Sequence, residues 1–243
     1  MLQLDEGFQF GLGVFTTIAV ENRHAILLEK HLERLQKSQD FFGFTHSITA
    51  SLVEDYIKAQ ALEKAAVKIM LSEKNILITH RENPYTLEHF RAGFRLNISG
   101  VYRNETAQLT YHKSLNYGEN ILEKQKSIKM GYHEPIFLNS KGQIAEGATT
   151  NIFFIKGDKI YTPETSCGLL AGVVRAYLLE QYSIEEASIY PHKLEIFDEC
   201  FVTNALMGVM PVASIGNQAF TKREQTKKIS TDYQRAWGLS PNF

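Results

Sequence analysis

Hydrophobic and polar residues follow two different periods in the N-terminal third of this chain, and both periods are clear. Residues 25–44 place leucine and phenylalanine near helical spacing, which predicts an amphipathic helix with Gly43 as its C-cap. A second helix is expected over residues 49–63. Shorter runs rich in β-branched and aromatic residues predict strands, the first of them entered through a glycine turn, at residues 10–20, 66–73 and 75–82.

The pattern lapses at residues 83–92 and then resumes, which indicates a boundary between two subdomains. We therefore expect a small N-terminal α+β subdomain over residues 1–85 and a larger C-terminal subdomain over residues 92–243. The elements predicted for the second part are a strand at 94–102, a helix at 116–130, a meander of strands at 134–163, a helix at 171–182 and a strand–turn–strand at 199–215. Strands cluster and helices fall irregularly between them, so the fold class is α+β rather than doubly wound α/β.

Composition narrows the classes of function. The chain has 243 residues and a formal net charge of -1, so no nucleic-acid surface is indicated. Its apolar runs are far shorter than a membrane span, and its first ten residues lack the basic segment of a signal peptide. The two cysteines, Cys167 and Cys200, have no CxxC partner. They are expected to be reduced thiols of a cytoplasmic protein, and no metal site is expected.

One lysine and one acid stand where cofactor chemistry is possible. Lys113 lies just ahead of the helix predicted at 116–130, and Glu146 lies just before a predicted strand. Such a pair is the minimal equipment for pyridoxal 5′-phosphate (PLP), because an amine binds the aldehyde covalently and an acid keeps the pyridine nitrogen protonated. Taken alone, each residue is better explained by an ordinary role, Lys113 as a solvated lysine and Glu146 as an acid in a hairpin turn.

Four further residues and one threonine are candidates for binding and catalysis. Val173 and Val174 open a predicted helix, whose free backbone N–H groups are a natural seat for a phosphate. Arg34 on the first amphipathic helix and Asn204 at a strand end could donate to the same group. Thr17 alternates with hydrophobic neighbours on the first strand and could relay a proton. An exposed arginine, a turn asparagine and a strand threonine are the plain alternatives.

Taken in order, six segments resemble the fold type IV class of PLP-dependent enzymes, which contains branched-chain and D-amino-acid aminotransferases and 4-amino-4-deoxychorismate lyases. The segments are DEGFQFGLGVFTTI, HLERL, KSLNY, EGATTNIF, LLAGVVR and TNALMGVMPV, which lie between residues 5 and 212. By this resemblance Lys113 is the Schiff-base lysine and Glu146 the partner of the pyridine nitrogen, whereas Arg34, Val173, Val174 and Asn204 form the phosphate site.

The first and last of these segments most resemble the lyases, and Thr17 then resembles the threonine associated with lyase chemistry. A D-amino-acid or branched-chain aminotransferase on the same scaffold is the alternative. The resemblance further implies a homodimer, with the cofactor in a cleft between the subdomains of each chain. The larger C-terminal subdomain, residues 92–243, is then expected to carry Lys113 and most of the PLP contacts.

This sequence departs from the usual motifs of the family at three places, and together they affect the expected substrate binding more than the expected cofactor binding. Glu6 stands where an arginine is usual, and residues 72–75 replace a Ser/Thr-Arg-Gly turn that binds a substrate carboxylate in some members. Val174 replaces a common threonine, which removes one hydroxyl from the phosphate site.

Overall fold

The structure, a computed structural model, describes residues 2–240. Its contacts divide the chain into two units, Met1–Pro84 with His112–Gly118, and Tyr85–Tyr111 with Glu119–Phe243. The first break lies within the stretch 83–92, where the hydrophobic pattern lapses. The described helices and strands form a mixed α+β fold, as the sequence predicts.

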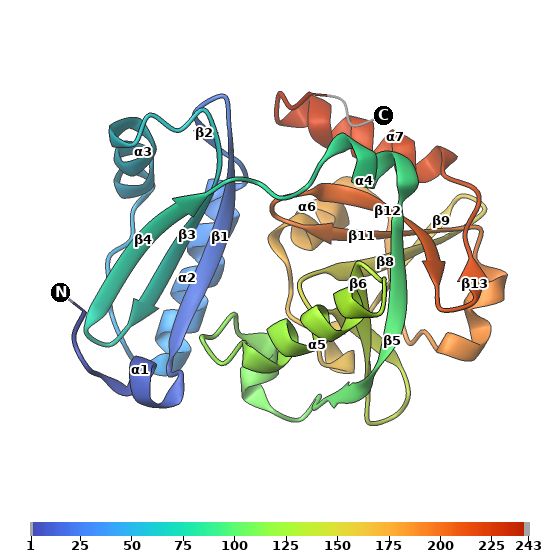
Figure 1. Cartoon of the computed structure of the whole chain (residues 1–243), viewed down its shortest axis with the longest axis horizontal. Coiled ribbons are helices and arrows are strands. Elements are labelled where there is room, and N and C mark those ends of the chain that lie inside the picture. The colour runs from blue at the N-terminus through green and yellow to red at the C-terminus, as the bar shows by residue number, and fades with distance from the viewer. Residues whose placement is uncertain (1, 241–243) are drawn as a thin grey trace. The chain divides into compact units, whose positions relative to one another are not determined.

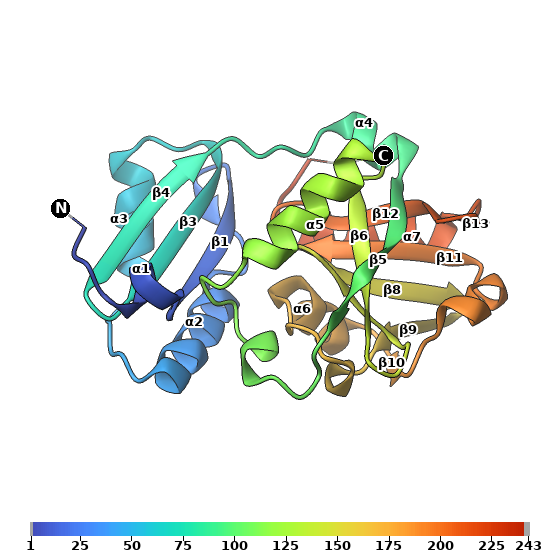
Figure 2. The same ribbon diagram turned by 60° about the horizontal axis from the view of Figure 1, so that its bottom comes forward.

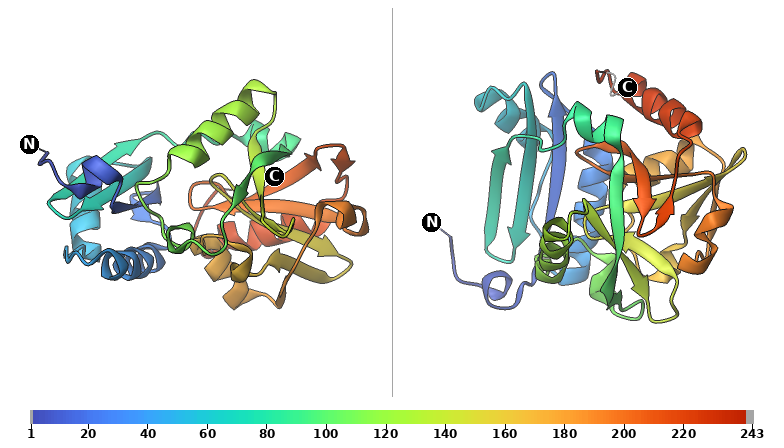
Figure 3. Two further views of the ribbon diagram at one scale, coloured as in Figure 1. Left: turned by 90° about the horizontal axis from the view of Figure 1, so that it is seen from below. Right: turned by 45° about the vertical axis from the view of Figure 1, so that its right-hand side comes forward.

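The first unit is a four-stranded antiparallel sheet in the order β2-β1-β3-β4. Its elements are α1 (Glu6–Phe10), β1 (Gly13–Glu21), β2 (His24–Ala25), α2 (Leu28–Phe42), α3 (Ala50–Ala59), β3 (Lys64–Ser72) and β4 (Asn75–Arg81). Helices α2 and α3 cover one face of this sheet, as the left view of Figure 3 shows. The predicted helices and strands of this unit are therefore present, and Gly43 ends α2 with φ +77° as its C-cap.

Alternation along β1 gives the sheet of this unit two different faces. Val14, Ile18 and Val20 point to the core, where they pack with Leu35 of α2 and other buried residues. The residues between them, including Phe15, point to the opposite face. Of the candidate residues of the first unit, Thr17 lies on this strand, on the face opposite the core.

The segment that contains Lys113 belongs to this first unit. Phe15 N–H donates to the Lys113 carbonyl over 2.9 Å, and Leu115 N–H donates to the Gly13 carbonyl over 2.8 Å. These bonds fasten residues 112–118 along the outer edge of β1, where Val14 and Ser114 form a bridge. Lys113 is therefore carried by the first unit and not by the C-terminal subdomain to which the sequence assigned it.

The second unit is built on a mixed nine-stranded sheet, ordered β10-β9-β8-β11-β12-β5-β6-β7 with β13 added to β12 (Figures 1 and 2). Its strands are β5 (Phe94–Arg103), β6 (Glu134–Asn139), β7 (Ile144–Gly147), β8 (Asn151–Lys156), β9 (Lys159–Pro163), β10 (Ile184–Ala187), β11 (Glu199–Asn204), β12 (Gly208–Ile215) and β13 (Gln218–Ala219). Its α-helices are α4 (Leu87–Ala92), α5 (Gly118–Lys129), α6 (Val173–Gln181) and α7 (Glu224–Ala236). Three short 3₁₀ turns occupy Gln108–Tyr111, Thr165–Cys167 and Pro191–Ile196.

The core of this unit is apolar, and helix α7 lies along β11 and β12 (Figure 1). Phe154, Val202 and Met210 from three neighbouring strands are completely buried in it. Cys167 and Cys200 are both buried free thiols. Among residues 2–240, none of the helices combines the length and apolar character needed to cross a bilayer.

Candidate active site

The amine of Lys113 lies against two aromatic rings in the first unit. Its Nζ is 4.6 Å from the ring centroid of Phe15 and 4.6 Å from that of Tyr117. The Tyr117 hydroxyl is 3.5 Å from the same nitrogen, and the two rings meet edge to face at 5.1 Å. A half-buried amine bordered by aromatic rings and a hydroxyl is the environment that covalent catalysis by lysine requires.

A second lysine lies on the same face of the first sheet. Lys68 on β3 is paired in register with Thr17 on β1, and its Nζ is 4.5 Å from the Phe15 ring centroid. Burial, and then the charge of Arg81, lower the pKa of Lys68. Thr17 is half-buried and, two residues from Phe15, faces the same way. The amines of Lys113 and Lys68 thus both lie against the Phe15 ring, and Thr17 is on the same face of the sheet.

Arg34 is half-buried on α2, and no carboxylate lies within ion-pairing distance of it among the described residues. Its Nη2 donates to the hydroxyl of Thr16 over 3.0 Å. Burial lowers the pKa of Arg34 to about 10, opposed by the nearby Tyr117, so the guanidinium stays charged at neutral pH. A desolvated cation without an acid suits an anionic ligand group such as a phosphate.

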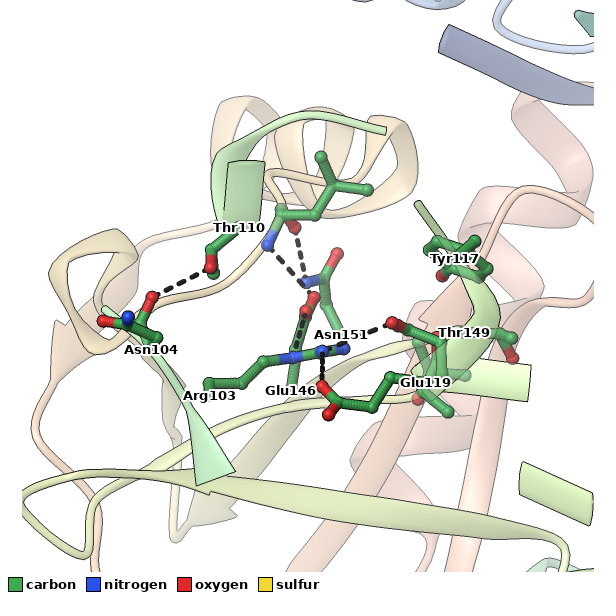
Figure 4. A network of polar contacts seen from close by, with 12 residues as sticks. Arg103, Asn104, Thr110, Tyr117, Glu119, Glu146, Thr149 and Asn151 are labelled. Atoms are coloured by element: carbon green, nitrogen blue, oxygen red, sulfur yellow. Dashed lines mark hydrogen bonds and ion pairs between the residues drawn. The ribbon is translucent and has the colours of Figure 1, made fainter. Parts of the chain in front are cut away.

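Glu146 is the buried acid of the second unit, at the end of β7. Its Oε1 lies 3.1 Å from Nε of Arg103, and its Oε2 accepts the backbone N–H of Leu170 over 3.0 Å. Figure 4 shows the Arg103 and Glu146 side chains directed at each other. The Arg103 guanidinium also stacks on the Phe137 ring at 4.0 Å. These contacts fix the direction of the carboxylate, as an acid that partners a pyridinium nitrogen requires.

The segment that leads into α6 is held by two side chains, because Glu146 accepts the Leu170 N–H and Asn151 bonds to Leu170 and Gly172. Asn151 Nδ2 donates to the Leu170 carbonyl over 2.8 Å, and its Oδ1 accepts the Gly172 N–H over 3.1 Å. A Cβ on Gly172 would come within 2.2 Å of that Oδ1, so this approach requires glycine. Gly172 provides no side-chain cap, and the first N–H groups of any α-helix have no acceptor within the helix.

Val173 and Val174 begin α6, and both are buried. Their side chains have no polar atom, so they can contribute to phosphate binding with backbone N–H groups alone. Asn204 ends β11, where its Oδ1 accepts the N–H groups of Leu206 and Met207, each over 3.0 Å. Its Nδ2 donates to the Tyr85 hydroxyl over 2.9 Å. The asparagine therefore orders its turn, and one of its two amide hydrogens is already donated.

The sequence candidates fall into one group in each unit. Arg34, Thr17 and Lys113 belong to the first unit, and the remaining candidates, Glu146, Val173, Val174 and Asn204, belong to the second. Sequence reasoning missed Arg103, Lys68 and Thr16. The sequence alone gives little indication of Lys68, because its position opposite Thr17 follows from the register between β1 and β3.

The donor set fits PLP on chemical grounds. The first unit supplies an amine that suits the aldehyde and a cation that suits the phosphate, and the second unit supplies an acid that suits the ring nitrogen and a helix N-terminus that suits the phosphate. Within residues 2–240, no group of three histidine, cysteine or acidic side chains is placed to hold a metal ion.

Comparison with known proteins defines the class. The model of the amino-transferase class IV family matches residues 13–215, and the chain belongs to this family. Members of this family are PLP-dependent enzymes.

Among individual relatives, the aminodeoxychorismate lyase of Bacillus subtilis (strain 168) is 24% identical, covering 95% of this chain and 87% of that protein. The D-alanine aminotransferase of Bacillus licheniformis is 26% identical, covering 96% of this chain and 90% of its own. The solved structure of 4-amino-4-deoxychorismate lyase from Pseudomonas aeruginosa matches with a TM-score of 0.85 at 24% identity, over 97% of this chain and 96% of that one. The fold is therefore shared with enzymes of both activities.

Proposed function

We propose that this enzyme is a PLP-dependent lyase that converts 4-amino-4-deoxychorismate to 4-aminobenzoate and pyruvate, a step of folate biosynthesis. The observation that carries the proposal is the sheet face of the first unit. There the Nζ atoms of Lys68 and Lys113 both lie within 4.6 Å of the Phe15 ring centroid, and the hydroxyl-bearing Thr17 is paired with Lys68. A base, a hydroxyl and a second cation suit an elimination whose leaving group carries a carboxylate.

When bound, PLP would supply the electron sink for the carbanion next to the substrate nitrogen. The Lys113 Nζ would hold the cofactor and, once released by the substrate amine, take the proton from the ring carbon that bears nitrogen. Glu146 would hold the proton on the pyridine nitrogen, while Arg34 and the N–H groups of Val173 and Val174 would bind the phosphate.

The remaining residues act on the leaving group. The carbon–oxygen bond to the enolpyruvyl group breaks as the six-membered ring becomes aromatic. Lys68 would attract the enolpyruvate carboxylate, and the hydroxyl of Thr17 or the ammonium of Lys113 would give a proton to its methylene carbon, which completes pyruvate.

The turn between β3 and β4 argues against a small amino acid as substrate. An aminotransferase must grip an α-carboxylate, and residues 72–75 contain no arginine. The turn is instead bound to Asp5, whose Oδ2 accepts from Ser72 Oγ, Lys74 N and Asn75 Nδ2 at 2.6, 2.9 and 2.8 Å.

An aminotransferase acting on D-amino or branched-chain amino acids is the second candidate. It would use the same lysine and acid. It is supported by the sequence identity of this chain to a D-alanine aminotransferase, which is close to its identity to an aminodeoxychorismate lyase. The two activities differ in their need for an amino acceptor.

The test is to supply purified enzyme with aminodeoxychorismate and no 2-oxo acid. We expect 4-aminobenzoate and pyruvate in equal amounts over many turnovers. On the same preparation, transamination of D-alanine or leucine with 2-oxoglutarate should be slow. If that transamination is the faster reaction, the lyase assignment is wrong and the aminotransferase takes its place.

A variant tests the role of Lys68. Lys68→Met should raise KM for aminodeoxychorismate by roughly tenfold, the scale of one lost charged contact, while PLP retention stays unchanged. Lys58→Met, on the exposed side of α3, is the matched control. An unchanged KM in Lys68→Met would exclude this lysine from substrate binding.

A further inference from the structure

A buried chain of hydrogen bonds lies between β1 and α2 in the first unit. The side chains of Thr16 and His31 are completely buried, and Thr16 Oγ1 lies 2.6 Å from His31 Nδ1. The same Oγ1 accepts a hydrogen bond from Arg34 Nη2 over 3.0 Å. His31 and Arg34 are three residues apart on α2 and so share the helix face that meets the strand.

The chemistry of the three groups fixes the direction of one of these two bonds. A guanidinium only donates, so Arg34 must donate to the Thr16 oxygen. A hydroxyl has one proton and two lone pairs, so Thr16 either donates to an unprotonated His31 Nδ1 or accepts from a protonated one. The first direction uses the hydroxyl proton between the two side chains and puts the ring proton of a neutral His31 on Nε2. Burial, followed by the charges of Arg34 and Lys113, lowers the pKa of His31 well below 6.5, which agrees with a neutral ring.

Packing alone does not account for this arrangement. Thr16 lies between Val14 and Ile18 on the core face of β1, where an apolar side chain would need no partner. His31 Nε2 is buried with no hydrogen-bond partner in the described part of the protein, so the position of the ring leaves one of its own polar atoms unsatisfied. The two hydrogen bonds do, however, fix the direction of the Arg34 guanidinium.

We propose that Thr16 and His31 are positioning residues, which hold Arg34 ready to bind the phosphate of the cofactor. This inference rests on the assignment of Arg34 to the phosphate in the proposed function. It does not depend on whether the enzyme is a lyase or an aminotransferase. A guanidinium held in place before binding loses less rotational freedom when the anion arrives, and its affinity for the anion is higher.

The first test measures PLP dissociation constants in the absence of substrate. Thr16→Val, which keeps the shape but removes the hydroxyl, should weaken PLP binding by at least about tenfold, as the loss of a hydrogen bond to a charged group does. Thr16→Ser restores the hydroxyl and should restore most of the affinity. Pyridoxal, which lacks the phosphate, should bind wild type and Thr16→Val equally.

A double-mutant cycle separates positioning from general damage to the fold. In an Arg34→Ala background, Thr16→Val should cause no further loss of PLP affinity, because the residue it orients is absent. Thr45→Val, which changes an exposed threonine in the loop after α2, should retain PLP like wild type. Equal losses from Thr16→Val with and without Arg34, or equal losses for PLP and pyridoxal, would overturn the proposal.

The tautomer of His31 provides a measurement that needs no cofactor. In ¹⁵N-labelled protein at neutral pH, the Nδ1 shift of His31 should be that of an unprotonated acceptor, and His31→Leu should weaken PLP binding as Thr16→Val does. A proton found on Nδ1 would show that His31 does not accept from Thr16 and would overturn the inferred direction of this hydrogen bond. If His31→Leu does not fold, His31→Asn, which keeps an acceptor near the Nδ1 position, should retain most of the PLP affinity. A loss in His31→Asn that is equally large in an Arg34→Ala background would overturn the role of His31.

Discussion

Arg103 and Glu146 form an ion pair whose side chains are almost entirely removed from solvent, at 10% and 8% exposure. Removal of one member of such a pair leaves a buried charge without compensation, which costs about 3–5 kcal/mol of stability. The pair therefore links the acid that we propose as the partner of the pyridine nitrogen to the stability of the second unit.

Glu146→Gln should lower turnover by at least ~100-fold, because an amide does not hold the proton on the pyridine nitrogen as an ion pair does. The same variant should have a lower melting temperature. Glu119→Gln is the matched control, since Glu119 is exposed and lies 3.9 Å from the same guanidinium. Steady-state rates and calorimetry on both variants check the expectation, and a Glu146→Gln enzyme with normal turnover would make Glu146 a structural residue only.

At the scale of elements, Asp5 joins the start of the chain to the β3–β4 turn. Its Oδ1 caps α1 by accepting the Phe8 N–H over 3.2 Å, and its Oδ2 accepts from the turn. The hydrogen bond from Ser72, and then those from the backbone of Lys74 and Phe8 and the side chain of Asn75, lower the pKa of Asp5 to about 2.

A lowered folded-state pKa gives stability that is present above the unfolded value, near 3.8, and is lost as the pH falls towards 2. Asp5→Asn should therefore melt below wild type at pH 7, and the difference should shrink between pH 4 and pH 2. Thermal unfolding across this range tests it, with Asp40→Asn on the exposed side of α2 as the control. A difference that is constant with pH would mean that the carboxylate charge is not what holds the turn.

Helix α7 shows why part of the fold could not be predicted from the sequence. Three of its five buried residues, Thr226, Ser230 and Gln234, are polar, so few apolar side chains mark this helix in the sequence. Its N-terminus is capped from β11, where Glu199 accepts from the Thr226 N–H over 2.8 Å and from its hydroxyl over 2.7 Å. By contrast, Leu28, Leu32 and Leu35 of α2 pack in the core of the first unit and a glycine ends the helix, and the sequence located both features.

The candidate site was predictable to the same uneven degree. Lys113 and Glu146 lie in recognisable motifs, and their surroundings in each unit suit the chemistry expected of them. The position of Arg103 beside Glu146 could not be predicted, because an arginine at a strand end is common and its partner depends on how the strands pair. Thr16 and Thr17 are adjacent in the sequence, and only the pleat of β1 separates their roles.

At the scale of the whole molecule, apolar side chains remain on the surface of α5. Ile121 and Ile128 are 42% and 55% exposed and, seven residues apart, lie on one helix face, with Leu122 beside them at 65%. Single exposed apolar residues are normal, but a group of them indicates a binding surface. We propose that the enzyme is a homodimer and that this face of α5 contributes to the interface.

Sedimentation velocity should find a dimer for wild type, and Leu122→Glu should shift the distribution towards monomer. Leu87→Glu, which changes an exposed leucine on α4, should leave the dimer intact. A wild-type monomer at micromolar concentration would disprove the dimer, and a dimeric Leu122→Glu variant would place the interface elsewhere.

The Arg103–Glu146 pair has a consequence for how the enzyme is made. The acid that would serve the cofactor is neutralised by a residue of the same chain, so a newly synthesised chain can complete the second unit without its vitamin-derived partner. The supply of PLP should therefore determine what fraction of the enzyme is active but not how much folded enzyme accumulates. Protein produced under vitamin B6 limitation should be recovered in normal yield and should gain activity within the time needed for diffusion and covalent attachment, with no refolding step.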